Sequence, residues 1–201
     1  MKKAFAFLLC LSLLVASFSI VSNAATTHTV VPGDTLWKIA NKYEVGLSEI
    51  KSANPNIRNY NLIYPGDVIN IPTGNSSVKS FESEVVRLVN AERTKRGLSV
   101  LRENWQLSRV ARYKSEDMRK NGYFSHNSPT YGTPFQMIKS FGITYRAAGE
   151  NIAKGQTTPA AVVNAWMNSQ GHRANILNSS FTEIGVGYDA KGHYWTQMFI
   201  G

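Results

Sequence analysis

A run of small polar residues from Thr73 to Ser80 separates two stretches of this chain whose apolar residues follow different patterns. The run contains Gly, Asn and Ser and has no apolar periodicity, which is typical of a short flexible linker. Before it, the pattern changes several times within residues 28–72. After it, long apolar stripes at helical spacing begin near residue 81. The sequence therefore predicts a small unit over 28–72, a linker over 73–80 and a larger unit over 81–200.

The N-terminus predicts export. Basic residues at Lys2 and Lys3 precede an apolar run that ends at Val21, and small residues up to Ala24 follow it. This order predicts a secretory signal over 1–24, cleaved after Ala24. An uncleaved membrane anchor is the alternative, because a run of this length just spans a bilayer. Bulky residues precede Cys10, so we do not expect lipid attachment there. The membrane is then contacted only transiently, through the signal.

Composition narrows the class of protein and of partner. The 201 residues are 43% hydrophobic, which predicts a folded chain, and the single Cys excludes a disulfide-stapled fold or a zinc finger. The formal net charge of +9 suits nucleic acid, an anionic membrane or an anionic cell-wall polymer. Export makes nucleic acid an unexpected partner and favours the cell wall. The sequence specifies no oligomeric state.

The small unit predicts the order strand, helix, helix, strand. A β-branched stretch over 29–31 ends at a Pro-Gly turn, and Asp34 or Thr35 caps a helix that closes at Asn41. A second short helix, with Ser48 as its cap, stops at an Asn-Pro pair. A final strand over 68–72 follows another Pro-Gly turn.

Two segments of this unit resemble the LysM module: Val-Pro-Gly-Asp-Thr-Leu-Trp-Lys-Ile-Ala over 31–40, and Asn-Pro-Asn-Ile with Leu-Ile-Tyr-Pro-Gly-Asp over 54–67. The resemblance implies a two-stranded antiparallel sheet with both helices on one face, and binding to peptidoglycan or another N-acetylglucosamine polymer. By position it implies glycan contacts at Gly33, Asp34, Thr35, Leu36, Asn56 and Ile57. In the alternative interpretation, the residues at 34 and 35 only cap a helix and the residue at 57 only fills the core.

The larger unit predicts an α+β fold. Apolar stripes indicate helices over 81–97, 107–122, 135–141 and from Thr158 to Trp166, and two apolar runs flanking 189–192 indicate a hairpin. The first two helices also carry many Arg and Lys residues. We interpret these basic faces as solvated surface, with attraction to anionic wall polymers as the second interpretation.

Few residues can carry chemistry. The chain has no Gly-x-Ser-x-Gly, no phosphate-binding Gly-rich loop and no His-Glu-x-x-His, and its predicted mature part has no Cys. The remaining polar clusters surround His126, Glu150 and His172. These three could hold a divalent metal or act as acid and base, although their spacing matches no metal motif.

The clusters resemble the CAP superfamily of cysteine-rich secretory, antigen 5 and pathogenesis-related proteins. The motifs are Phe-Ser-His over 124–126, Gly-Glu-Asn-Ile-Ala over 149–153, Trp-Met-Asn-Ser over 166–169 followed by Gly-His-Arg, and Ile-Gly-Val-Gly-Tyr over 184–188. The resemblance implies an α-β-α sandwich with a cleft lined by two His and two acidic residues.

His126, Glu150 and His172 match three of those positions, and Ser169 stands where eukaryotic members carry Glu. No cofactor is therefore required, and His126 and His172 are expected to bind a divalent metal only weakly. In the alternative interpretation, Glu150 holds a loop. His28 and His193 are expected at the surface or in the hairpin.

Together these features predict a secreted protein of the bacterial cell wall or spore envelope that binds peptidoglycan and presents a cleft to a ligand. One alternative is a metal-assisted hydrolase of wall material with Glu150 as base. Another is a purely structural role in wall or spore-envelope assembly. Catalysis is not expected, because no nucleophile lies beside a recognisable activating base.

Overall fold

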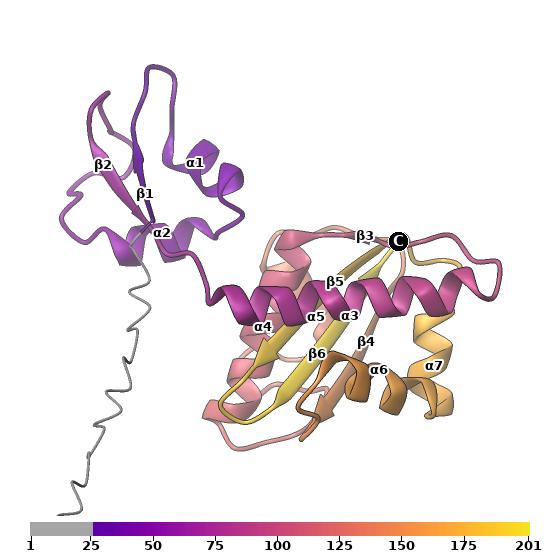
Figure 1. The fold of residues 1–201 in the computed structure, drawn as a ribbon. Coiled ribbons are helices and arrows are strands. Elements are labelled where there is room, and N and C mark those ends of the chain that lie inside the picture. Colours follow the sequence, from indigo (N-terminus) through magenta and orange to yellow (C-terminus); the bar gives the residue numbers. More distant parts are fainter. Residues whose placement is uncertain (1–25) are drawn as a thin grey trace, which may run out of the picture.

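The computed structural model describes residues 26–201, so the predicted signal over 1–24, with Cys10, lies outside the described residues. The described chain forms an N-terminal unit (residues 26–72) and a C-terminal unit (residues 76–201), and the C-terminal unit begins with a long helix (Figure 1). Within the described part of the chain, no helix has the length and apolar character needed to cross a membrane.

The N-terminal unit has the predicted order of elements. Strand β1 (Thr26–Thr29) pairs antiparallel with β2 (Val68–Ile71), and helices α1 (Leu36–Lys42) and α2 (Leu47–Ala53) lie between them in the chain. The first strand includes only residue 29 of the β-branched stretch over 29–31 expected to form it. Buried apolar side chains from both helices, from β2 and from the residue that follows β1 form one core: Val30, Leu36, Ile39, Ala40, Ile50, Ile69 and Ile71.

The first helix starts as expected, and the next two helices along the chain start elsewhere than expected. Thr35 caps α1, since its hydroxyl accepts a hydrogen bond from the Lys38 amide at 3.2 Å. The N-cap of α2 is Gly46 rather than Ser48, whose hydroxyl instead donates to Glu49. Helix α3 (Ser76–Thr94) begins inside the predicted linker, because the Asn75 side chain accepts from the Ser77 amide at 2.9 Å.

The C-terminal unit is built on a four-stranded sheet. Its order is β3 (Arg102–Glu103), β5 (Glu183–Asp189), β6 (Tyr194–Ile200) and β4 (Ala148–Lys154). Strand β3 is parallel to β5, and the other neighbours are antiparallel. The β5–β6 hairpin is the predicted one. Strand β4 is an edge strand that the sequence pattern does not predict.

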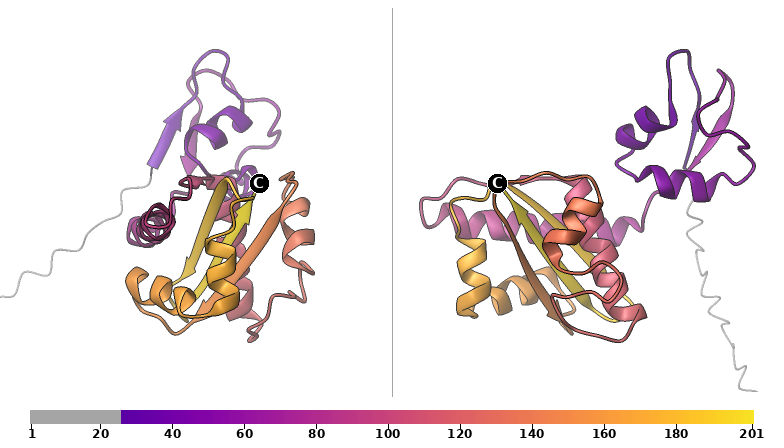
Figure 2. Two further views of the ribbon diagram at one scale, coloured as in Figure 1. Left: turned by 90° about the vertical axis from the view of Figure 1, so that its right-hand side faces the viewer. Right: turned by 180° about the vertical axis from the view of Figure 1, so that it is seen from behind.

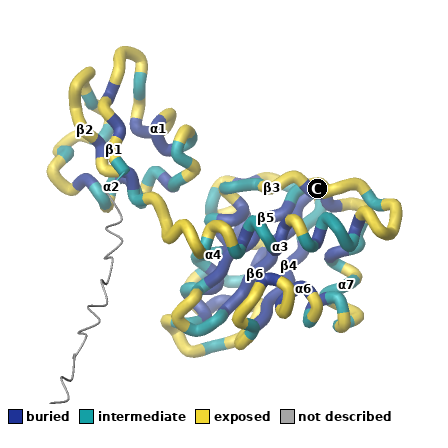
Figure 3. The backbone as a smooth tube through the Cα atoms, in the orientation of Figure 1, coloured by how far each residue is buried: buried dark blue, intermediate teal, exposed yellow. Residues whose placement is uncertain are grey.

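Helices cover both faces of the sheet and form the expected α-β-α sandwich (Figure 2). Helices α3, α6 (Pro159–Met167) and α7 (Gln170–Ile176) pack on one face, around the buried indoles of Trp166 and Trp195. Helices α4 (Trp105–Lys120) and α5 (Pro134–Ser140) pack on the other. Burial in this unit is concentrated in β4, β5 and β6, and exposure in the connecting loops (Figure 3).

Two glycines bring α4 directly against the sheet. A Cβ placed at Gly185 would lie 2.3 Å from the Leu107 carbonyl carbon, and one at Gly187 would lie 2.1 Å from that of Ala111. Both clashes are with backbone, which cannot swing aside. The Ile-Gly-Val-Gly-Tyr segment therefore alternates residues that fill the core under α3 with residues that leave room for α4.

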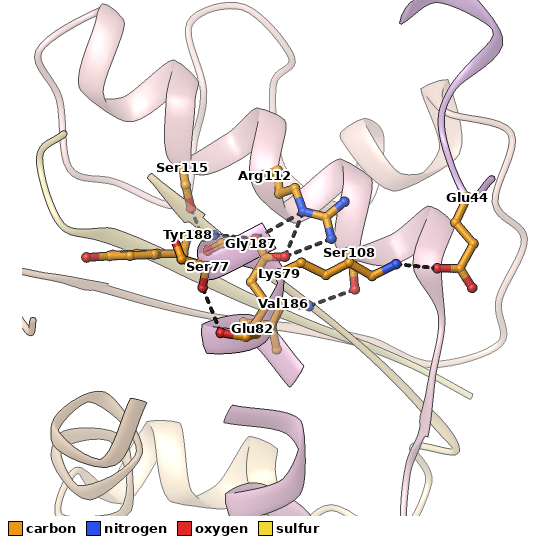
Figure 4. Close-up of polar contacts among 11 residues, drawn as sticks. Glu44, Ser77, Lys79, Glu82, Ser108, Arg112, Ser115, Val186, Gly187 and Tyr188 are labelled. Carbon is orange, nitrogen blue, oxygen red and sulfur yellow. Dashed lines mark hydrogen bonds and ion pairs between the residues drawn. The ribbon is translucent and has the colours of Figure 1, made fainter. Parts of the chain in front are cut away.

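Hydrogen bonds and an ion pair reinforce the position of α4 (Figure 4). The fully buried Glu82 of α3 pairs with Arg112 at 2.7 Å and accepts from the Tyr188 amide at 3.0 Å. Burial raises the pKa of Glu82, although Arg112 opposes this change. On α4 itself, the Ser115 hydroxyl donates to the Gly187 carbonyl at 3.0 Å. Helices α3 and α4 are thus fixed to the same strand.

The basic face of α4 is not simply solvated surface, which corrects our first interpretation. The Arg109 guanidinium donates to both oxygens of Glu49 in the N-terminal unit, at 2.5 and 2.8 Å, and the Tyr113 hydroxyl also donates to Glu49 at 2.9 Å. Lys79 pairs with Glu44 at 2.8 Å. A cavity of about 540 Å³ lies between the two units beside these pairs.

Candidate functional site

His126 and Glu150 meet at the edge of the sheet. Glu150 belongs to β4, and His126 lies in the loop between α4 and α5. The imidazole Nδ1 lies 2.7 Å from Glu150 Oε1. The His126 side chain is 53% exposed, whereas that of Glu150 is 2% exposed. A buried carboxylate therefore orients an imidazole that solvent, or a ligand, can reach.

The environment of Glu150 disfavours its ionised form. Burial raises the pKa of this carboxyl, and the hydrogen bond with His126 and the charge on Lys114 lower it only in part. Within the described residues, the second oxygen, Oε2, is buried without a hydrogen-bond partner. Glu150 therefore has one oxygen that is free to accept a hydrogen bond.

His172 lies in α7, the helix that is hydrogen-bonded to the strand that carries Glu150. Burial lowers the pKa of the His172 imidazole, and the charge on His126 lowers it further. The backbone carbonyl of His172 accepts a hydrogen bond from Asn151 Nδ2 at 3.1 Å, and Asn175 donates to the Glu150 carbonyl at 3.2 Å. The amide side chains of Asn151 and Asn175 thus tie α7 to the strand that carries Glu150.

Two charged residues of α4 complete the site, although no sequence motif predicts them there. Lys114 is 1% exposed, and its ammonium donates to the His126 carbonyl at 2.7 Å. Burial lowers the pKa of Lys114, while the carboxylates of Glu150 and Asp117 raise it. Asp117 accepts hydrogen bonds from four side chains of the loop that carries His126: Asn121, Tyr123, Ser128 and Thr130. Both residues fix the loop, and the signal for them is their place in the buried stripe of α4.

The predicted glycan residues of the N-terminal unit have unequal access to solvent. Gly33, Thr35 and Asn56 are exposed, Asp34 and Ile57 are half-buried, and Leu36 is 3% exposed. The Leu36 side chain is therefore part of the core and does not line the surface, and the predicted glycan contact at this position stays a prediction. Ile57 packs against the same core.

His28 also differs from expectation, because it is buried rather than on the surface. Its Nε2 lies 2.8 Å from Asp34 Oδ2, and its Nδ1 lies 3.1 Å from the Tyr43 hydroxyl. The hydrogen bonds from His28 and from the Val31 amide hold the pKa of Asp34 below its usual value. His28 thereby positions the loop that carries the predicted glycan residues. His193 lies in the β5–β6 turn, as expected.

Known proteins resemble both units. A family model described as "Cysteine-rich secretory protein family" (CAP) matches residues 86–199, and a LysM domain model matches residues 28–72. The uncharacterized protein YkwD of Bacillus subtilis (strain 168) is 63% identical over 126 residues, which cover 63% of this chain and 49% of that protein. This chain thus spans about half the length of that relative.

Two further matches bear on the two units. N-acetylmuramoyl-L-alanine amidase sle1 of Staphylococcus aureus (strain USA300) is 38% identical over 79 residues, which cover 39% of this chain and 23% of that protein. The crystal structure of an extracellular protein containing a SCP domain, from Bacillus anthracis str. Ames, is 34% identical with a TM-score of 0.59. It covers 68% of this chain and 47% of that one.

Proposed function

Because this chain belongs to the cysteine-rich secretory protein (CAP) family and carries a LysM domain ahead of its CAP domain, we propose that it is a secreted protein of the bacterial cell wall or spore envelope. The N-terminal unit binds N-acetylglucosamine polymers of peptidoglycan. The C-terminal unit presents His126, Glu150 and His172 to a ligand.

The LysM domain is the observation that carries the wall-binding proposal. Its two strands and two helices enclose a core of their own, and the predicted contact residues Gly33, Thr35 and Asn56 face solvent. Exposed backbone, hydroxyl and amide groups suit the hydroxyls and acetamido group of an amino sugar. Two relatives support the location, since one is named for the N-acetylmuramoyl-L-alanine linkage and another is described as extracellular.

The cleft supports binding more directly than catalysis. Glu150 offers a buried oxygen without a partner, and His126 offers an exposed imidazole. The one observation that favours a hydrolase is the raised pKa of Glu150, which suits a general base or acid. Release of muropeptides from purified peptidoglycan by the wild-type protein, but not by Glu150→Gln, would establish the hydrolase instead.

Sedimentation with insoluble peptidoglycan tests the wall-binding proposal. The full chain and a fragment over 25–74 are expected to sediment, and a fragment over 75–201 to stay in solution. The cut precedes Asn75 because that side chain caps α3. If the 25–74 fragment stays in the supernatant while the other sediments, the assignment of binding to the N-terminal unit is wrong.

A matched pair of variants in the full chain tests the binding surface. Asn56→Ala should weaken binding about fivefold, the effect of losing one hydrogen bond of about 1 kcal/mol. Asn61→Ala changes another exposed Asn of the same unit and should bind as the wild type does. Equal binding by both variants and the wild type would remove Asn56 from the proposed contact.

A further inference from the structure

The cleft of the C-terminal unit holds a buried cation of its own. Lys114 reaches it from α4, and its ammonium is anchored at 2.7 Å on the backbone carbonyl of His126. The Lys114 side chain cannot turn out to solvent without leaving that carbonyl, because the residue is 1% exposed. Its positive charge acts on Glu150, the only acidic residue among the three predicted cleft positions.

The residues of the cleft do not fit the divalent metal that the family resemblance implies. Within residues 26–201, no group of three or more His, Cys, Asp or Glu side chains is arranged to hold a metal ion. His126 Nδ1 and Glu150 Oε1 are engaged with each other, which leaves Nε2 of His126 and the buried Oε2 of Glu150 for a metal, and Ser169 supplies no charge where a second acidic ligand is expected. Glu150 is then the one carboxylate among the predicted positions, and the Lys114 ammonium lies on the backbone carbonyl of its partner His126.

We infer that Lys114 determines the ligand class of this cleft: its ammonium, held on the His126 carbonyl, takes the electrostatic place of a divalent cation beside the pair of His126 and Glu150, so the native cleft binds no divalent metal. This inference rests on the proposed role of the C-terminal unit as a binding cleft, and it assigns Lys114 as a specificity-determining residue. The ligand of the cleft is then a neutral or anionic polar group that the imidazoles of His126 and His172 can contact.

Charge repulsion gives the expected size of the effect. A divalent ion bound by His126 and Glu150 would lie near an ammonium fixed to the same loop, in a partly buried site where water screens charges poorly. Removing the ammonium should therefore raise metal affinity by about tenfold or more.

Zinc titration of the full chain tests this assignment. Lys114→Met removes the charge and keeps an unbranched side chain of similar length. Lys120→Met is the matched control, because Lys120 lies on the same helix with a 60% exposed side chain and, among residues 26–201, pairs only with Glu116. Binding is followed through the imidazole NMR signals of His126 and His172, so that binding at His28 or His193 is not mistaken for binding at the cleft.

The expected result is that Zn²⁺ up to about 1 mM leaves these signals unchanged in the wild type and in Lys120→Met, while Lys114→Met shows saturable shifts at a concentration at least about tenfold lower. Saturable shifts in the wild-type protein below that concentration would overturn the inference. So would a folded Lys114→Met with no gain in affinity. If the melting curve shows that Lys114→Met does not fold, Lys114→Gln replaces it in the titration. The wild-type titration tests the inference without either variant. Sedimentation with peptidoglycan measures the N-terminal unit, so failure of the zinc titration and failure of the wall-binding proposal can be told apart.

Discussion

Asp117 is the residue on which the geometry of the cleft depends most. Its carboxylate is 2.7 Å from Asn121 Nδ2, 2.5 Å from the Tyr123 hydroxyl, 2.7 Å from Ser128 Oγ and 2.6 Å from Thr130 Oγ1. The four donors all belong to the end of α4 and the loop that carries His126. Asp117→Ala is therefore expected to loosen the loop and to separate His126 from Glu150.

The magnitude follows from the number of hydrogen bonds and from their surroundings. A hydrogen bond to a charged group contributes about 1.5–3 kcal/mol, but the contributions of one cluster do not add, and freed hydroxyls near the surface regain water. We expect Asp117→Ala to lower the free energy of unfolding by about 3–4 kcal/mol, at the upper end for a single substitution. The control is Glu116→Ala, whose exposed pair with Lys120 should be worth less than about 1 kcal/mol.

Urea unfolding of the wild type and both variants measures this difference, and hydrogen exchange of the amides over 121–132 shows whether the loop opens. Burial alone would raise the pKa of Asp117, but hydrogen bonds from Thr130, Tyr123 and Ser128 outweigh it and hold the pKa below its usual value of 3.8. The stability that Asp117 contributes is thus present above pH 3.8 and is lost as pH falls through the lowered pKa. The wild type and Asp117→Ala should converge there. A loss at pH 7 no larger than that of Glu116→Ala would refute the reasoning.

Three other substitutions test the cleft, the packing and the contact between units. The double variant His126→Ala, His172→Ala should keep sedimentation with peptidoglycan and lose less than about 2 kcal/mol of stability in urea unfolding, because the His126 side chain is half exposed; a loss of several kcal/mol would show these residues to be structural. Gly187→Ala should cost about 3 kcal/mol or more in urea unfolding, because its Cβ would strike the backbone of α4; an unchanged midpoint would contradict that packing. Arg109→Glu should separate the two units and raise the radius of gyration in small-angle scattering. Adding Glu49→Arg should restore the radius if the pair holds the units together.

The elements that the sequence predicts are those whose signals are local. At the start of α5, the Thr133 hydroxyl accepts a hydrogen bond from the Gln136 amide, and the Gln136 side chain accepts one from the Thr133 amide. Thr158 followed by Pro159 begins α6. Each motif lies within four residues of the chain. Strand β4 has no such signal, because its internal residues are buried although two of them, Glu150 and Asn151, are polar. Their partners come from a loop and a helix distant in sequence, so no local pattern announces a strand.

The residues of the site also divide into those with a signal in the sequence and those without one. His126, Glu150 and His172 were identified by their resemblance to a family, since their spacing alone matches no motif. Lys114 and Asp117 were not identified as site residues, because nothing local in the sequence shows that their partners lie in the loop after α4. Lys114 and Asp117 become buried partners of the loop after α4 only because the folded chain packs that loop against the helix.

Helix α4 is the element that relates the two proposed binding surfaces. Arg109, near its start, contacts the N-terminal unit, and Asp117, near its end, holds the loop of the cleft. Between them, α4 rests on Gly185 and Gly187 with no space for a side chain, and Ser115 is bonded to β5. A helix held so closely cannot slide along the sheet without breaking these contacts. The cleft and the glycan-binding unit are therefore related by fixed position rather than by a transmitted motion, and a change at Arg109 that frees the N-terminal unit should leave the contact between His126 and Glu150 intact.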